Sequence, residues 1–171
     1  METRGVISFI AKQSKEPLTI AEVGVSAGEH ALSMLKMLPI KELYLIDNYA
    51  PYQDGNIFRS QLEQGKHYAG MFKKVKEFYD KVILVTKDSD FASTLFADNY
   101  FDLIYIDACH DYAEIKKDIS NWWPKVKPGA YLGGHDYCES WPGVIKAVGE
   151  LTDTNQATLQ TFNDIDWLVK K

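Results

Sequence analysis

Short apolar runs alternate with amphipathic stretches along most of the chain. The apolar runs are rich in Ile, Leu and Val, which is typical of strands buried on both faces of a sheet. Between them, apolar residues recur with helical spacing, as Ile115, Ile119 and Trp122 do. Strands are predicted at 19–23, 42–47, 81–86, 101–107 and 130–135. Because strands and helices alternate five times, the pattern predicts a parallel sheet with helices on both faces.

The two ends of the chain and one long connection complete the expected organisation. Apolar residues on one face of 3–14 predict a leading helix within residues 1–17, and 158–162 and 166–170 are expected to form a closing antiparallel pair. Residues 48–80 are long for a connection between strands. They are predicted to hold a loop and two helices, near 58–64 and 67–79, and to shape a substrate pocket.

Composition and charge narrow the class of protein. A chain of 171 residues is expected to fold as one domain, residues 1–171. The net charge of −5 argues against nucleic acid as the main partner, since no basic stripe is present to neutralise phosphates. No apolar run reaches membrane-spanning length, no signal peptide is evident, and two cysteines do not make a disulfide framework. These features favour a cytoplasmic protein without membrane partners.

A glycine-containing turn follows the first predicted strand. Glu22, Gly24, Ser26 and Gly28 lie within seven residues, and Ser26 with Glu29 has the spacing of a helix-capping box. A strand that enters a helix through glycines presents free N–H groups at the helix start, where α/β sheets bind nucleotide-like ligands. The phosphate loop GxxxxGK[ST] and the dinucleotide fingerprint GxGxxG are both absent.

The pattern ExGxxxG in this turn resembles motif I of class I S-adenosylmethionine-dependent methyltransferases. The resemblance covers nearly the whole chain, from about Ile20 to Lys171. It implies a Rossmann-like, doubly wound, mostly parallel seven-stranded sheet with an antiparallel closing strand. It also implies that S-adenosylmethionine is the cofactor and that Glu22, Gly24, Ser26 and Gly28 help to bind it.

Four predicted strands end at or just before an aspartate: Asp47, Asp88, Asp107 and Asp136. The carboxyl ends of parallel strands lie along one edge, so these carboxylates are expected to face one crevice. Aspartate also favours strand exits and helix caps for local reasons, which is the alternative for each residue.

In the methyltransferase family, residues at the first two of these positions contact the nucleoside of the cofactor. The resemblance assigns Asp47 to the ribose hydroxyls. It assigns Asp88, with Ser89, to the adenine amino group, although capping of the next helix explains Asp88 equally well. Asn48 and Tyr49 are expected to line the ribose and adenine pocket.

The segments 101–110 (FDLIYIDACH) and 127–137 (KPGAYLGGHDY) resemble metal-dependent sugar O-methyltransferases of macrolide pathways and, more distantly, catechol-type enzymes. The resemblance implies that Asp107 and Asp136 bind magnesium, that Asp107 also borders the cofactor, and that His110 is the catalytic base. Tyr137 replaces the asparagine that is a third ligand in catechol-type enzymes. The third ligand is therefore open between His135, water and a residue of 48–80.

Cysteine and histidine residues also allow another metal site. Cys109–His110 and His135–Cys138 would lie close together if the fourth and fifth strands are neighbours, as a Cys2His2 zinc site requires. Their spacing matches no usual zinc ribbon or finger, so reduced, unliganded cysteines are favoured.

The expected activity is methyl transfer from S-adenosylmethionine to a hydroxyl of a small molecule or sugar, assisted by a divalent metal, with Mg²⁺ favoured. Two alternatives use the same fold: a hydroxylase resembling the cephalosporin type, and a binding module that holds the cofactor without turnover. Trp141 is expected at the mouth of the pocket. A homodimer is a further possibility, because a partner would supply a missing pocket wall.

Overall fold

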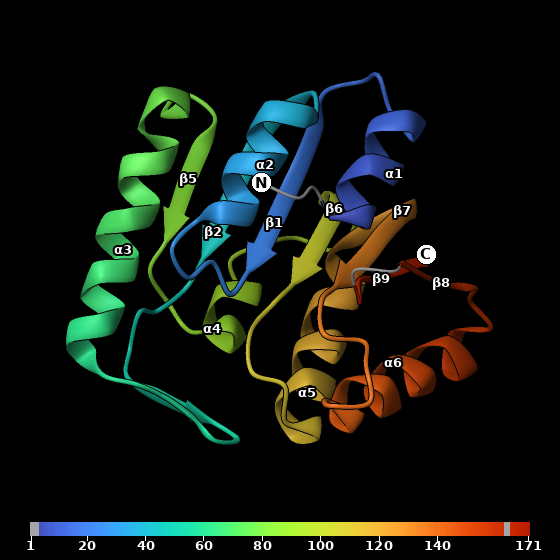
Figure 1. The fold of residues 1–171 in the computed structure, drawn as a ribbon. Coiled ribbons are helices and arrows are strands. Elements are labelled where there is room, and N and C mark those ends of the chain that lie inside the picture. The colour runs from blue at the N-terminus through green and yellow to red at the C-terminus, as the bar shows by residue number, and fades with distance from the viewer. Residues whose placement is uncertain (1–3, 163–164) are drawn as a thin grey trace.

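The computed structural model describes residues 4–162 and 165–171, which form a seven-stranded sheet and a separate two-stranded hairpin (Figure 1). The strands of the large sheet are β1 Leu18–Val23, β2 Ile40–Ile46, β5 Val82–Val85, β6 Phe101–Ile106, β7 Val126–Gly134, β8 Leu159–Thr161 and β9 Trp167–Lys170. Their order is β5-β2-β1-β6-β7-β9-β8. Five strands are parallel, and β9 pairs antiparallel with both β7 and β8. The expected doubly wound, mostly parallel fold with an antiparallel closing strand is confirmed.

Helices cover both faces of this sheet. The α-helices are α1 Gly5–Gln13, α2 Glu29–Met37, α3 Gln61–Val75, α4 Ser89–Ser93, α5 Tyr112–Trp122 and α6 Pro142–Asn155, and short 3₁₀ helices are η1 Lys76–Phe78 and η2 Trp123–Lys125. One apolar core joins α1, α2 and α3 to the sheet through Val6, Met34 and Met71. The second core joins α4, α5 and α6 to the opposite face through Ala92 and Trp122, among others.

The central strand β1 aligns the ends of its two neighbours. All six of its residues are buried, as expected of a strand covered on both faces. Val23 pairs in register with Ile46 of β2 and Ile106 of β6. The residues that follow these three strands therefore emerge side by side at one edge of the sheet, where a ligand site of an open α/β sheet is expected.

The connection 48–80 differs from its prediction. Instead of two α-helices, it contains a hairpin of β3 Tyr52–Asp54 and β4 Ile57–Arg59, followed by one α-helix, α3, and the short η1. Gly55 adopts a left-handed φ of +55° in the hairpin turn. A capping box of Ser60 and Glu63 then starts α3. Figure 1 shows the hairpin extending from the carboxyl end of β2 toward α5.

Two other local predictions differ from the structure. Ser26 and Glu29 do not form a capping box, because the N-cap of α2 is Gly28. Ser26 has a φ of +50°, and its hydroxyl contacts His67 instead. The fifth strand, predicted at 130–135, is longer than expected, since β7 begins at Val126 and includes residues 127–129.

The helix expected to begin at Thr3 is observed as α1, and Thr3 itself lies outside the described residues. Across residues 4–162 and 165–171, no helix combines the length and the apolar character that crossing a membrane requires.

Candidate functional site

The turn after β1 requires glycine for a packing reason. Gly24 has φ of +84°, and a Cβ atom added there would lie 2.1 Å from the carbonyl oxygen of Asp107. The Gly24 N–H donates to Ile46 O over 2.9 Å, and the Asp107 N–H donates to Val23 O over 2.7 Å. The backbones at the ends of β1, β2 and β6 are therefore in direct contact, and a side chain at position 24 would separate them.

Asp47 organises this turn through its carboxylate. Oδ2 accepts hydrogen bonds from the N–H groups of Val25 and Ser26, both at 3.0 Å, and Oδ1 accepts one from the Tyr49 N–H at 2.8 Å. Tyr49 adds a hydrogen bond from its hydroxyl to Ser26 O at 3.0 Å. The residue expected at the ribose thus also fixes the backbone of the glycine turn.

A cavity of about 270 Å³ opens at the carboxyl ends of these strands. It lies where the fold predicts a ligand. Seven of the predicted cofactor residues line it: Gly24, Ser26, Asp47, Asn48, Asp88, Ser89 and Asp107. The remaining three, Glu22, Gly28 and Tyr49, are not among the lining residues.

Glu22 lies beneath the turn and is almost fully buried. Its Oε1 is 3.0 Å from Nδ1 of His30, which is also buried. Burial raises the pKa of Glu22 well above its usual value and lowers the pKa of His30 to about 3. Burial therefore favours the neutral form of both side chains, which connect β1 to α2 beneath the turn.

Asp88 and Ser89 have structural contacts at the cavity wall. The Asp88 side chain caps α4 by accepting a hydrogen bond from the Phe91 N–H at 2.9 Å. The Ser89 hydroxyl donates to Asp118 and accepts from Trp122 Nε1. The capping alternative for Asp88 is therefore present in the structure, and both residues still border the cavity.

Asp107, at the end of β6, forms an ion pair with Arg4, which the sequence analysis did not identify. Arg4 Nη1 is 2.7 Å from Asp107 Oδ2, and it also donates to the Tyr105 hydroxyl at 2.7 Å. Arg4 is the residue before α1, 103 positions away from Asp107 along the chain. The N-terminal segment thus supplies a cation to the predicted metal ligand.

His110 lies between two carboxylates. Its Nδ1 is 2.5 Å from Asp54 Oδ2, and its Nε2 is 2.7 Å from Asp136 Oδ2. The indole of Trp141 stacks on the imidazole, with ring centroids 4.5 Å apart. Burial alone would lower the pKa of His110, but hydrogen bonding to Asp136 and Asp54 raises it to about 9. The imidazole is therefore protonated at neutral pH in this arrangement.

Asp136 contacts a second histidine. His135 Nδ1 is 3.0 Å from Asp136 Oδ2, and His135 Nε2 is 4.0 Å from the buried Asp166. Burial would raise the pKa of Asp136, but His110 and His135 together hold it below its usual value. Asp136 has a left-handed φ of +62°, so the backbone is held in an unfavourable conformation where these side chains meet.

Among the described residues, Asp107, His110 and Asp136 each bring one donor atom within 4.8 Å of the others. Carboxylate oxygens are the donors that hard divalent ions prefer, so Asp107 and Asp136 fit Mg²⁺ in donor type, whereas a protonated His110 would not be a ligand. His135 is not in this group. An ion bound here would share Asp107 with Arg4 or displace Arg4.

The zinc alternative of Cys109, His110, His135 and Cys138 is not assembled in the described part of the chain. Both cysteines are free, and Cys138 joins neither of the donor groups found there. Cys109 instead lies near Asp54 and Asp111.

Two site residues lacked a usable signal in the sequence. Asp54 lies in 48–80, where the sequence predicts only a loop and two helices, and Arg4 lies in the predicted leading helix. Asp54 reaches His110 because β3 and β4 fold back from the end of β2 over the loop after β6. The stacked position of Trp141 agrees with its expected place near the site.

Known proteins resemble this chain in sequence and in fold. Residues 21–137 match a family described as a methyltransferase domain. An uncharacterized protein, R132 of Acanthamoeba polyphaga mimivirus, is 26% identical over 146 residues, which is 84% of this chain and 63% of that protein. The chain thus spans less than two thirds of this relative's length.

Solved structures share the fold at low sequence identity. The O-methyltransferase NovP is 16% identical, with a TM-score of 0.69, over 97% of this chain and 78% of NovP. A Streptococcus mutans protein solved in complex with SAH is 13% identical, with a TM-score of 0.67, over 100% of this chain and 99% of that one. The family match covers more than half of the chain and includes the glycine turn and the strand-end aspartates. This chain therefore belongs to the methyltransferase-domain family and has the class I methyltransferase fold.

Proposed function

We propose that this chain transfers a methyl group from S-adenosylmethionine to a hydroxyl of a small molecule or sugar, with a divalent ion at Asp107 and Asp136. Residues 1–171 would act as one catalytic domain, and 48–80 would form part of the acceptor pocket. The observation that carries the proposal is one continuous site. The cavity beside the glycine turn contains Asp107 in its wall, and Asp107 belongs to the donor group with His110 and Asp136.

The cofactor half of the proposal rests on the family and on the cavity. S-Adenosylmethionine is the methyl donor that the family implies. In this assignment the Asp47 carboxylate accepts the ribose hydroxyls while it holds the turn, Asn48 borders the ribose, and Asp88 with Ser89 borders the adenine. The backbone N–H groups of the turn face the methionine portion. Positioning the donor methyl against the acceptor would supply most of the rate enhancement.

The acceptor half of the proposal concerns Asp107, Asp136 and His110. A divalent ion, when bound, lowers the pKa of an acceptor hydroxyl and orients it. Asp107 and Asp136 would hold this ion, and His110 would accept the hydroxyl proton at Nε2 after giving up its own. Asp54 orients His110 through Nδ1, and Trp141 covers the imidazole and keeps water from one of its faces.

The test is methyl transfer from radiolabelled S-adenosylmethionine to a panel of phenolic and sugar hydroxyl acceptors, before and after chelation. We expect transfer that chelation abolishes and Mg²⁺ restores. Full activity after exhaustive chelation would remove the metal from the proposal. A requirement for reduced iron would indicate the hydroxylase, and cofactor binding without transfer to any acceptor would indicate a binding module.

Replacing Asp47 by asparagine is expected to weaken binding of S-adenosylhomocysteine by about ten- to a hundredfold. A hydrogen bond to a charged group contributes about 1.5–3 kcal/mol, and Asp47 accepts several. Calorimetry measures the affinity. Asp102→Asn is the matched control, because Asp102 also accepts a backbone N–H, from Thr19, but at the amino end of β1. Equal losses in both variants would reject the ribose assignment.

Replacing Arg4 by glutamine is expected to raise the affinity for Mn²⁺ by about five- to thirtyfold. The substitution removes a positive charge that is paired with Asp107, and repulsion of an incoming cation by such a charge costs about 1–2 kcal/mol in a partly exposed site. Electron paramagnetic resonance measures free Mn²⁺ directly. Lys127→Gln removes a lysine paired with Asp102 and serves as the control. An unchanged or lower affinity in Arg4→Gln would contradict the placement of the ion at Asp107.

A further inference from the structure

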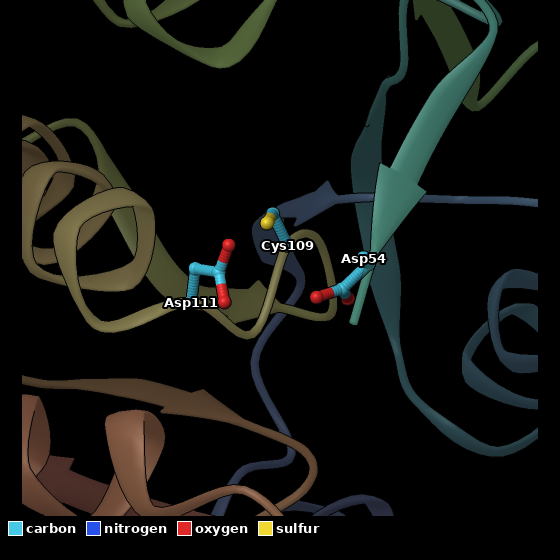
Figure 2. Close-up of side chains that lie close together, drawn as sticks. All are labelled: Asp54, Cys109 and Asp111. Carbon is cyan, nitrogen blue, oxygen red and sulfur yellow. The ribbon is translucent and has the colours of Figure 1, made fainter. Parts of the chain in front are cut away.

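A second group of possible metal-binding atoms lies beside Asp107, His110 and Asp136. Asp54 ends β3, and Cys109 and Asp111 flank His110 in the loop between β6 and α5. Figure 2 shows the two carboxylates on opposite sides of Cys109, both directed toward it. One donor atom from each residue lies within 4.8 Å of the other two. Segments that are distant in sequence thus converge on one point.

Asp54 contributes a buried oxygen atom that has no partner. Only 2% of the residue is exposed to solvent. Its Oδ2 accepts hydrogen bonds from the backbone N–H and from Nδ1 of His110, but its Oδ1 is buried and has no hydrogen-bond partner. Leaving an oxygen of a buried carboxylate unsatisfied is costly, so this atom is suited to a ligand that supplies positive charge.

Asp111 also keeps its carboxylate available. It occupies the N-cap position of α5, where aspartate commonly accepts a backbone N–H, but its side chain makes no such hydrogen bond. The carboxylate is turned toward Cys109 instead, as Figure 2 shows. The helix therefore does not account for the orientation of this side chain, whereas a shared ligand would.

We propose that Asp54, Cys109 and Asp111 bind a divalent cation of the zinc class. A thiolate favours a softer ion than Mg²⁺, and zinc accepts sulfur and carboxylate oxygen together. Binding forms the metal–sulfur bond and releases the thiol proton to solvent. Three protein ligands leave a fourth coordination position for water or another small ligand, which is the arrangement of zinc sites that are not purely structural.

This site is distinct from the proposed Mg²⁺ site at Asp107 and Asp136, but the two are connected. It uses none of Asp107, His110 and Asp136 as a ligand, yet Asp54 bonds to His110 through its other oxygen. Cys109 also lines the cavity proposed for the cofactor. An ion held here would thus lie in the wall of that cavity. The proposal does not depend on methyl transfer, since it concerns only the binding of a cation.

The first test is titration of the reduced 171-residue chain with Cd²⁺, which reports zinc-class sites through the ultraviolet charge-transfer absorption of a cadmium–thiolate bond. We expect saturation at one ion per chain and complete loss of this band in Cys109→Ser. Cys138→Ser is the matched control, because it removes the other free cysteine, and it should keep the band. A band that survives in Cys109→Ser, or that disappears in Cys138→Ser, would overturn the proposal.

The second test distinguishes binding at this site from binding to the Cys109 thiol alone and from binding at the proposed Mg²⁺ site of Asp107 and Asp136. Asp111→Asn should weaken Cd²⁺ binding at least about tenfold, since it removes a ligand charge. Glu114→Gln, which removes another acidic side chain at the start of α5, should change the affinity less than twofold, and excess Mg²⁺ should not displace Cd²⁺. Equal effects of the two substitutions, or displacement by Mg²⁺, would contradict the assigned ligands.

Discussion

Replacing His110 by glutamine is expected to lower the rate of methyl transfer by about two to four orders of magnitude, the usual contribution of a general base. Glutamine keeps a hydrogen-bond donor for Asp54 but can neither accept the hydroxyl proton nor carry a charge. Binding of S-adenosylhomocysteine should remain within about threefold of wild type, because the base acts in the transition state. Single-turnover kinetics with saturating cofactor and acceptor measure the rate.

The pH dependence provides an independent readout of the same residue. Because the pKa of His110 is raised to about 9, the imidazole is protonated at pH 7 and becomes a base only as it loses that proton. The wild-type rate should therefore rise with pH as His110 loses this proton, and this rise should be absent in His110→Gln. His135→Gln is the control, since His135 also contacts Asp136. Wild-type turnover in folded His110→Gln would show that His110 only stabilises the loop.

The raised pKa also affects stability. A group that gains a higher pKa on folding stabilises the native state below its unfolded pKa, 6.5 for histidine, and loses this contribution as the pH rises through the folded value of about 9. The His110-dependent part of the free energy of unfolding should therefore decline between these pH values. Urea unfolding of wild type and His110→Gln across this range isolates it.

Replacing Gly24 by alanine is expected to reduce the free energy of unfolding by about 2–5 kcal/mol and to abolish measurable cofactor binding. A left-handed conformation costs a non-glycine residue about 1–2 kcal/mol, and forcing an extra carbon into a packed site costs about 1–3 kcal/mol more. Here the added Cβ would lie 2.1 Å from Asp107 O, which is backbone and cannot rotate away. Urea unfolding and calorimetry with S-adenosylhomocysteine measure the two effects.

Gly129 provides a matched control for this substitution. Its φ of +80° is nearly the same as that of Gly24, but a Cβ added there has no atom within 4 Å. Gly129→Ala should therefore show only the conformational cost, about 1–2 kcal/mol, with unchanged cofactor affinity. Similar losses of stability in the two variants would mean that the loop after β6 moves away from position 24 at little cost.

The difference between prediction and structure in 48–80 has a physical origin. Residues 58–64 and 67–79 carry enough apolar and helix-forming residues to suggest two helices. The hairpin forms because Gly55 permits a turn with positive φ, and because Asp54 gains hydrogen bonds from His110 in another segment. The second of these contributions is invisible in the local sequence. The helical part was predicted more closely, since α3 occupies Gln61–Val75.

The sequence by itself determined the sheet, the helices around it and the edge where the site lies. These features follow from local apolar periodicity and from glycine and aspartate at strand ends, and both signals lie within short windows of the chain. The same signals placed Gly24, Asp47 and Asp107 beside one cavity, as the structure shows.

Only the tertiary structure decided which charges meet. Arg4 pairs with Asp107 across 103 positions, and Asp54 contacts His110 across 56. Such pairs form when packing brings distant segments together and removes water, and a single sequence carries no measure of that distance. The protonated state of His110 and the uncompensated oxygen of Asp54 have the same origin, because both depend on burial beside particular partners rather than on residue type.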